Sequence, residues 1–302
     1  MRIAAGLRAF LAAVGIALFV AAAPALARDT GAPDDAPALW KIETAKGRVF
    51  LFGSFHLLPP DVKWRTPAVE SALKEAEVVV FETDLEMMQN PQVMQASILK
   101  YGLLPQGQTL RYVLPGDTHA EFERRAADLR LPPANLAPFR PWLAAMTLSV
   151  GFMVTRGLDP NSGVEKQALA WAKAHGKALG SLETTEDQLR VFADLTREQE
   201  VQFLGMTLRQ IREMPNMLAD MLGAYRTGDV AALDRTLNIG LREFPLLRQR
   251  LLKDRHEKWL PRIEKMIVDG RTHVIIVGAA HLVGPDSVIA MLRAKGVKVD
   301  GP

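Results

Sequence analysis

Cysteine is absent from all 302 residues of this chain, and its absence limits the chemistry available. Without thiols there is no disulfide framework, no thiolate metal site, no cysteine nucleophile and no lipid-anchoring cysteine. Aromatic residues make up only 7% of the chain, but 48% of residues are hydrophobic and 24% are charged, as in ordinary globular proteins. A chain of this size buries roughly three quarters of its unfolded surface, so it needs no covalent or metal cross-links.

A long apolar run occurs at the N-terminus, over residues 9–27, after two arginines and ending in Ala-Leu-Ala. This is the layout of a secretory signal, and cleavage is expected after Ala27. An uncleaved anchor is the alternative, since the run is just long enough to cross a bilayer. We expect an exported protein, periplasmic in a Gram-negative bacterium, with no stable membrane span after cleavage. Residues 28–37, rich in Asp, Pro and Ala, are expected to form a flexible leader.

An excess of either charge is also missing. The chain has 37 basic and 34 acidic residues, and signal removal takes away two basic residues and no acidic ones, leaving a net charge of +1. Nothing in this balance indicates a nucleic-acid partner.

The apolar pattern predicts strands toward both ends of the mature chain and helices between them. Strand, helix and strand follow one another closely near the start, which predicts a βαβ unit with parallel strands. We predict an α/β fold with a mixed, largely parallel central sheet, built from N- and C-terminal βαβ-like halves. A single domain over residues 38–302 would carry a helical insertion at about 86–270. The predicted strands are 39–44, 48–52, 78–81, 178–182, 273–277 and 297–299.

Two nine-residue stretches resemble each other. Residues 53–61 read Gly-Ser-Phe-His-Leu-Leu-Pro-Pro-Asp, and residues 278–286 read Gly-Ala-Ala-His-Leu-Val-Gly-Pro-Asp. Each follows an apolar strand and precedes a helix, which suggests two half-units related by a local pseudo-twofold. Gly, Pro and Asp are common in such turns for conformational reasons, but this does not explain a histidine at the same place in each. We therefore take His56 and His281 as one candidate site.

Glu82 follows the buried strand at 78–81 directly, so it is placed at the carboxyl end of that strand. Ligands bind at the carboxyl ends of the strands in open α/β sheets. A carboxylate after four apolar residues is also costly to leave unpaired. We therefore add Glu82 to the site.

Two imidazoles and one carboxylate are able to hold a divalent ion such as Mn²⁺, Co²⁺ or Zn²⁺. Such an ion lowers the pKa of bound water to about 7 and polarises a carbonyl. In a metal-free version, one histidine acts as a general base oriented by Glu82. The residues leave both versions open. No H-E-x-x-H or cysteine-based zinc pattern is present.

The paired G-x-x-H motifs, together with Phe-Glu-Thr-Asp at 81–84, resemble the TraB/GumN family. This family is related to the TIKI metalloproteases and, more remotely, to the erythromycin-esterase/ChaN-like group. The resemblance implies an α/β sheet enclosed by helices and a hydrolytic site. It implies His56, Glu82 and His281 as catalytic or metal-binding residues, and Arg255 as a carboxylate or oxyanion contact. Family members often have Arg-Asn where this chain has Arg255-His256, so no role is carried over to His256.

The function predicted from these residues is an exported hydrolase that cleaves a peptide, amide or ester bond in a peptide or small-molecule substrate. The alternative is a non-catalytic periplasmic binding protein for a peptide, an envelope polysaccharide or haem. A scaffold that keeps the fold without activity is a third reading, because family and fold do not settle function.

Overall fold

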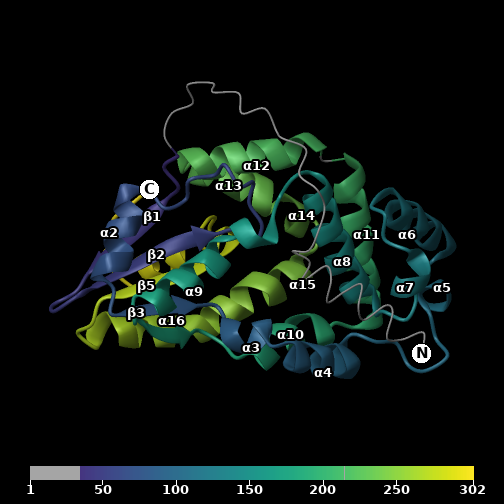
Figure 1. The fold of residues 1–302 in the computed structure, drawn as a ribbon, viewed down its shortest axis with the longest axis horizontal. Helices are drawn as coiled ribbons and strands as arrows, with labels where there is room; N and C mark the ends of the chain where they lie inside the picture. Colours follow the sequence, from purple (N-terminus) through teal and green to yellow (C-terminus); the bar gives the residue numbers. More distant parts are fainter. Residues whose placement is uncertain (1–34, 214) are drawn as a thin grey trace.

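A five-stranded sheet organises the computed structural model, which describes residues 35–213 and 215–302 (Figure 1). The expected signal and nearly all of the leader lie outside the described residues. The strand order is β1-β2-β5-β3-β4. Of the four strand pairs in this sheet, β1–β2 is antiparallel and the other three are parallel. The predicted mixed, largely parallel sheet is thus confirmed. The strands are β1 (Leu39–Glu43), β2 (Arg48–Ser54), β3 (Val78–Phe81), β4 (Ala178–Ser181) and β5 (His273–Gly278).

Burial along the strands follows their place in the sheet. The inner strands β3 and β5 are buried along almost their whole length, as expected when helices cover both faces. The edge strand β1 alternates between buried and more exposed residues, and β4 at the other edge has two exposed and two partly buried residues. β2 and β3 are parallel, as predicted, but β5 lies between them and pairs with both.

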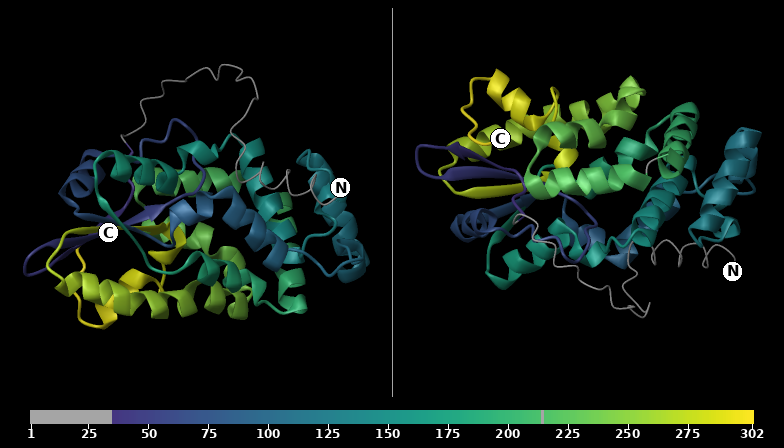
Figure 2. Two further views of the ribbon diagram at one scale, coloured as in Figure 1. Left: turned by 60° about the horizontal axis from the view of Figure 1, so that its bottom comes forward. Right: turned by 90° about the horizontal axis from the view of Figure 1, so that it is seen from above.

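Helices cover both faces of the sheet (Figure 2). α2 and α9 lie on one face, since both belong to connections that run from β2 toward β4 across the sheet. α16 lies on the other face, because the chain returns from β4 to β5 in the opposite direction and such crossovers are right-handed. α17, which follows β5, packs against α16 on that face. The helices with the sheet are α2 (Pro67–Glu75), α9 (Val164–Ala174), α12 (Pro215–Thr227), α13 (Val230–Leu237), α16 (Asp254–Val268) and α17 (Val288–Ala294).

The remaining helices form a second body beyond the carboxyl ends of the strands (Figure 1). They enclose a hydrophobic core of their own, separate from the core around the sheet. The strand ends therefore face protein rather than open solvent. These helices are α3 (Leu85–Gln89), α4 (Pro91–Tyr101), α5 (Leu110–Val113), α6 (Gly116–Asp128), α7 (Pro133–Leu136), α8 (Pro141–Thr155), α10 (Thr185–Ala193), α11 (Arg197–Glu213), α14 (Ile239–Arg242) and α15 (Pro245–Arg248).

The segment before α16 is wound differently from an α-helix. Residues Gln249–Lys253 form a π-helical turn, η2, which joins α15 to α16 without a break. π-helical turns are rare in proteins, and those that occur are often found at functional sites. This turn ends two residues before Arg255.

The predicted strand at 297–299 is wrong. After α17 the chain passes the sheet edge and makes a single antiparallel bridge, between Asp300 and Lys41. Residues 297–299 are not in a strand, and Asp300 makes only this isolated bridge in the described part of the chain. The second half-unit is therefore strand, turn and helix only. In both units the strand and turn are followed by a helix, but the two helices, α2 and α17, lie on opposite faces of the sheet (Figure 2).

None of the helices in the described part of the chain is both long and apolar enough to cross a membrane.

The start of α9 packs directly on the first G-x-x-H turn. The Val164 amide donates to the Phe55 carbonyl at 3.0 Å. A Cβ added at Gly163 would lie 2.0 Å from the His56 carbonyl oxygen, so only glycine allows this approach. The turn and the helix are thereby held together through their backbones.

We expect Gly163→Ala to lower the free energy of unfolding by about 2–3 kcal/mol, because the clash involves backbone that has no room to move. The matched control is Gly205→Ala within α11, where an added Cβ meets nothing within 4 Å. That change should stabilise by about 0.5–1 kcal/mol through helix propensity. Urea unfolding of the two variants measures both effects, and equal changes would contradict the close approach.

Candidate functional site

Four strand ends bring charged or polar side chains to the same edge of the sheet. β2 is followed by His56, β5 by His281, β3 by Glu82 and β4, two residues on, by Glu183. In the parallel register, Ser54 pairs with Gly278, and Phe81 pairs with both Ile276 and Ser181. The strands therefore end nearly level, and the residues after them lie within one region.

Arg255, on the first turn of α16, reaches the same region. Its Nη2 donates to Glu82 Oε2 at 2.6 Å and to Glu183 Oε1 at 2.7 Å, and its Nε donates to Glu183 Oε2 at 3.1 Å. Its Nη1 donates to His281 Nε2 at 3.0 Å and to the Leu251 carbonyl at 3.4 Å. A guanidinium has five N–H groups, and all five are used. Arg255 thus links the ends of three strands to α16.

Glu82 is held from several sides. Its Oε1 accepts the Gly278 amide at 2.6 Å, and its Oε2 accepts Gln188 Nε2 at 3.0 Å in addition to Arg255. The carboxylate on β3 therefore fixes the first residue of the second G-x-x-H turn. Burial opposes ionisation of Glu82, but Arg255, the nearby histidines and the Gly278 amide together outweigh it and keep the pKa of Glu82 well below its ordinary value.

His281 and His256 form a chain of hydrogen bonds that defines their tautomers. Because Nε2 of His281 accepts from Arg255, its Nδ1 carries the proton and donates to His256 Nε2 at 2.8 Å. His256 Nδ1 in turn donates to the Asp286 carbonyl at 2.7 Å. Burial lowers the pKa of His281 well below its ordinary value and that of His256 to about 4, so both rings are neutral at pH 7.

His56 lies in a different environment. Its side chain is 69% exposed, compared with 8% for His281. Its Nδ1 lies 2.8 Å from Glu165 Oε1 on the first turn of α9, and Ser54 Oγ donates to the same oxygen. Glu165 is buried, and its Oε2 has no hydrogen-bond partner among the described residues. His56 Nε2 has no protein partner in the described ranges, and most of the side chain is exposed.

The Glu165 carboxylate raises the pKa of His56 above its ordinary value of about 6.5, and Glu82 adds to this effect at longer range. Burial and the charge of Arg255 act in the opposite direction. Because much of the ring is exposed, solvent screens part of the rise. The two matching turns therefore carry histidines that differ in protonation. The surroundings of His56 favour its charged form, and those of His281 favour its neutral form.

Three of the four predicted site residues lie together. Glu82 and His281 both contact Arg255, and His281 Nε2 is 3.5 Å from Glu82 Oε1. His56 is at the same edge and is influenced by their charges, but no hydrogen bond or ion pair joins it to them in the described residues. The carboxylate beside His56 is Glu165, whereas Glu82 lies beside His281.

The predicted metal site of His56, Glu82 and His281 does not match this arrangement. Within residues 35–213 and 215–302, no three or more His, Asp or Glu side chains are grouped so as to hold a metal ion. Nε2 of His281 and both oxygens of Glu82 already accept N–H groups, and His56 faces Glu165. The donor set as folded does not fit a divalent ion.

Several site residues were not selected from the sequence. Glu183 follows its strand much as Glu82 does, so the same strand-end rule points to it. His256 sits in a charged run typical of a solvated helix face, yet it is 1% exposed. Glu165 carries no local signal, because its partner is more than a hundred residues away. Only the fold identifies it.

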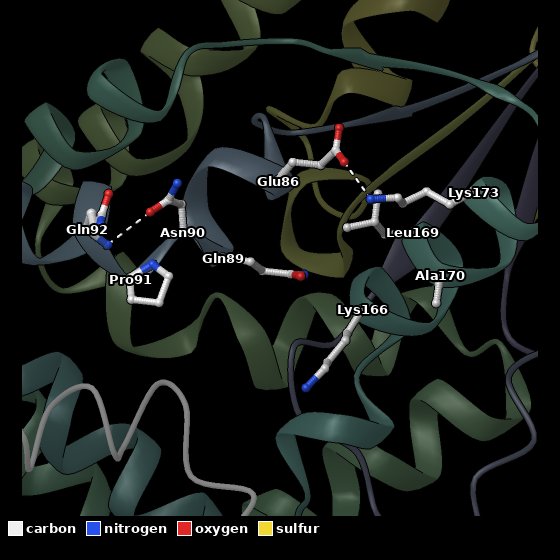
Figure 3. Close-up of a pocket in the computed structure, with 9 residues that line it drawn as sticks. All are labelled: Glu86, Gln89, Asn90, Pro91, Gln92, Lys166, Leu169, Ala170 and Lys173. Atoms are coloured by element: carbon white, nitrogen blue, oxygen red, sulfur yellow. Dashed lines mark hydrogen bonds and ion pairs between the residues drawn. The ribbon is translucent and has the colours of Figure 1, made fainter.

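A surface cavity of about 950 Å³ opens beside this region, between α9 and the segment of α3 and α4 (Figure 3). Glu86 and Lys173 form an ion pair across it at 2.6 Å. Most of the lining side chains are polar and none is aromatic. α9 therefore presents Glu165 to His56 at its start and lines the cavity along its length. The lining residues are Glu86, Gln89, Asn90, Pro91, Gln92, Lys166, Leu169, Ala170 and Lys173.

These features define an α/β protein with a buried charged centre at the carboxyl edge of its sheet. The chain belongs to the TraB/PrgY/gumN family, whose model matches residues 38–301. The predicted family is confirmed.

Individual relatives are distant. The uncharacterized protein YbaP of Escherichia coli is 24% identical over 243 residues, which cover 80% of this chain and 87% of YbaP. The metalloprotease TIKI1 of Danio rerio is 25% identical and matches 83% of this chain but 60% of its own length. No solved structure matches the chain.

Acidification should destabilise the protein through its buried histidines. The unfolded pKa of His256 is about 6.5 and the folded one about 4, so the stability of the neutral form is complete above pH 6.5 and is lost as the pH falls toward 4. We expect wild type to lose on the order of 3 kcal/mol more than His256→Asn across this window. Urea unfolding at pH 7 and pH 4 measures the difference. The exposed His175→Asn control should behave like wild type, and parallel losses in wild type and His256→Asn would contradict the assignment.

Proposed function

We propose that this chain is an exported, periplasmic hydrolase that cleaves a peptide, amide or ester bond, with His56 as its proton-transfer group. The observation that carries the proposal is the His56–Glu165 pair. A buried carboxylate holds Nδ1 of the imidazole, while Nε2 has no protein partner among the described residues and the side chain is largely exposed. A base oriented in this way by a third group is the arrangement expected for general acid–base catalysis. The metalloprotease TIKI1, a distant relative, supports hydrolysis as the reaction class.

The proposed reaction is attack by water on a carbonyl carbon. His56 Nε2 takes one proton from the water, whose oxygen forms the new bond to carbon. The resulting imidazolium is stabilised by Glu165 and then gives its proton to the nitrogen or oxygen of the leaving group as that bond breaks. Glu165 stabilises the charged form of the His56 ring, as the raised pKa of His56 indicates.

Arg255 is proposed to contact the developing oxyanion through one N–H group. Its bond to the Leu251 carbonyl, at 3.4 Å, is the longest of its five hydrogen bonds and lies on Nη1. That N–H is the one most easily redirected to a substrate oxygen, because the other four bonds go to charged or imidazole acceptors. Glu82 and Glu183 hold the guanidinium in place while this happens.

The cavity beside α9 is proposed to bind the parts of the substrate that flank the cleaved bond. Its lining offers amide groups from Gln89, Asn90 and Gln92 and an ammonium from Lys166. Such groups pair with the amides and carboxylates of a peptide. No aromatic side chain lines it to stack on a sugar ring, so the cavity favours a peptide over a polysaccharide.

The test begins with a screen of purified protein against fluorogenic peptides, aminoacyl anilides and nitrophenyl esters. For any substrate found, we expect His56→Ala and Glu165→Gln to lower kcat/KM by about 100-fold or more, the usual range for a lost general base. The control His175→Ala changes an exposed histidine that bonds to the Trp171 carbonyl and should retain full activity.

The pH profile separates the roles of the two residues. Since the general base must be neutral, kcat/KM of wild type should rise with pH through the raised pKa of His56. In Glu165→Gln the remaining rate should reach its plateau at lower pH, because the charge that raised the pKa is gone. A profile that does not move would show that Glu165 has only a structural role. Activity that survives His56→Ala would remove His56 from the mechanism.

A further inference from the structure

We propose that the Arg255 guanidinium is the resident cation of this centre and takes the position that a divalent metal ion would otherwise hold. The chain would then work without a metal at this site. For its role in catalysis this inference rests on the proposed hydrolase. Its consequences for cation binding can be measured without a substrate.

The donor atoms that would bind a metal are directed at the guanidinium. Three carboxylate oxygens, from Glu82 and Glu183, lie 2.6 to 3.1 Å from its nitrogens. Nε2 of His281 lies 3.0 Å from Nη1. Two carboxylates and an imidazole form a normal ligand set for a divalent ion. Here they surround an organic cation, with distances suited to hydrogen bonds rather than to metal bonds of about 2.0–2.2 Å.

The guanidinium is firmly held in this position. Arg255 is 9% exposed, and its Cζ lies 4.7 Å from the centre of the Trp259 ring. Trp259 Nε1 also donates to Glu183 Oε2 at 2.9 Å, so the ring fixes both the cation and one of its carboxylates. A metal ion would have to displace a buried cation that satisfies two buried carboxylates.

The hydrogen-bond chain behind His281 agrees with a permanent cation. His281 is directed by His256, which is fixed on the Asp286 carbonyl, so that its Nε2 lone pair points at Arg255. A second partner behind a ligating histidine usually serves to orient it toward a metal. In this chain the same device orients the ring toward Nη1.

The first experiment uses the wild-type protein. After treatment with a chelator and removal of any affinity tag, the protein is titrated calorimetrically with Zn²⁺, Mn²⁺ and Co²⁺. We expect no one-to-one binding of micromolar or tighter affinity that depends on Glu82. Glu82→Gln and His281→Gln show whether any uptake belongs to this centre. One equivalent bound by wild type and lost in both variants would overturn the proposal.

The second experiment removes the cation with Arg255→Ala. The vacated site should gain one equivalent of Co²⁺, visible by absorbance, and should also accept free guanidinium at millimolar concentration. Either ligand should raise the Tm of this variant and leave wild type unchanged. The matched control is Arg262→Ala, an exposed position of α16 whose only hydrogen bond goes to the Ser181 carbonyl among the described residues.

Failure of Arg255→Ala to take up either cation while keeping a native circular-dichroism spectrum would count against the proposal. If the variant does not fold, because two carboxylates are left buried and unpaired, the wild-type titration decides alone. These results are separate from the proposed hydrolysis. A metal at this centre would leave a hydrolase possible, and the absence of any substrate would leave the assignment of the cation intact.

Discussion

The salt bridge between Arg255 and two buried carboxylates connects the sheet to the rest of the molecule. Glu82 and Glu183 leave neighbouring strands, and neither could remain ionised there without a partner. Removing one member of such a buried group typically costs about 3–5 kcal/mol, because the charges left behind are uncompensated. α16 therefore lies where it does partly because its first turn carries the cation that the strand ends require.

This constraint also explains why two similar turns carry unlike histidines. The turn after β5 places His281 beside Arg255. Because Arg255 supplies the positive charge there, His281 remains neutral. The turn after β2 meets the first turn of α9, where a buried carboxylate lacks a cation, and His56 becomes its partner. The two turns are alike in sequence and in following parallel strands, but the charges around them differ.

The sequence predicted the sheet well because its strands are short apolar runs beside turn residues, and such signals are local. The strand-end rule likewise located Glu82, and the repeated motif located both histidines. The partners of these residues could not be predicted in the same way. Glu165 and Arg255 reach the site from helices far away in the chain, and their roles depend on which face each helix presents. His256 was hidden in a charged run, because only packing shows that this part of α16 is buried.

The orientation of the side chains of α16 toward the charged centre depends on the number of residues in the π-helical turn before that helix. Such a turn holds one residue more than an α-helical turn, and each residue rotates a helix by about 100°. The extra residue within Gln249–Lys253 thus sets the angular phase of everything that follows it in α16. In this phase Arg255, His256 and Trp259 face inward, whereas Glu257 and Lys258 face solvent. The turn that precedes the site along the chain thus determines which residues of α16 face the charged centre.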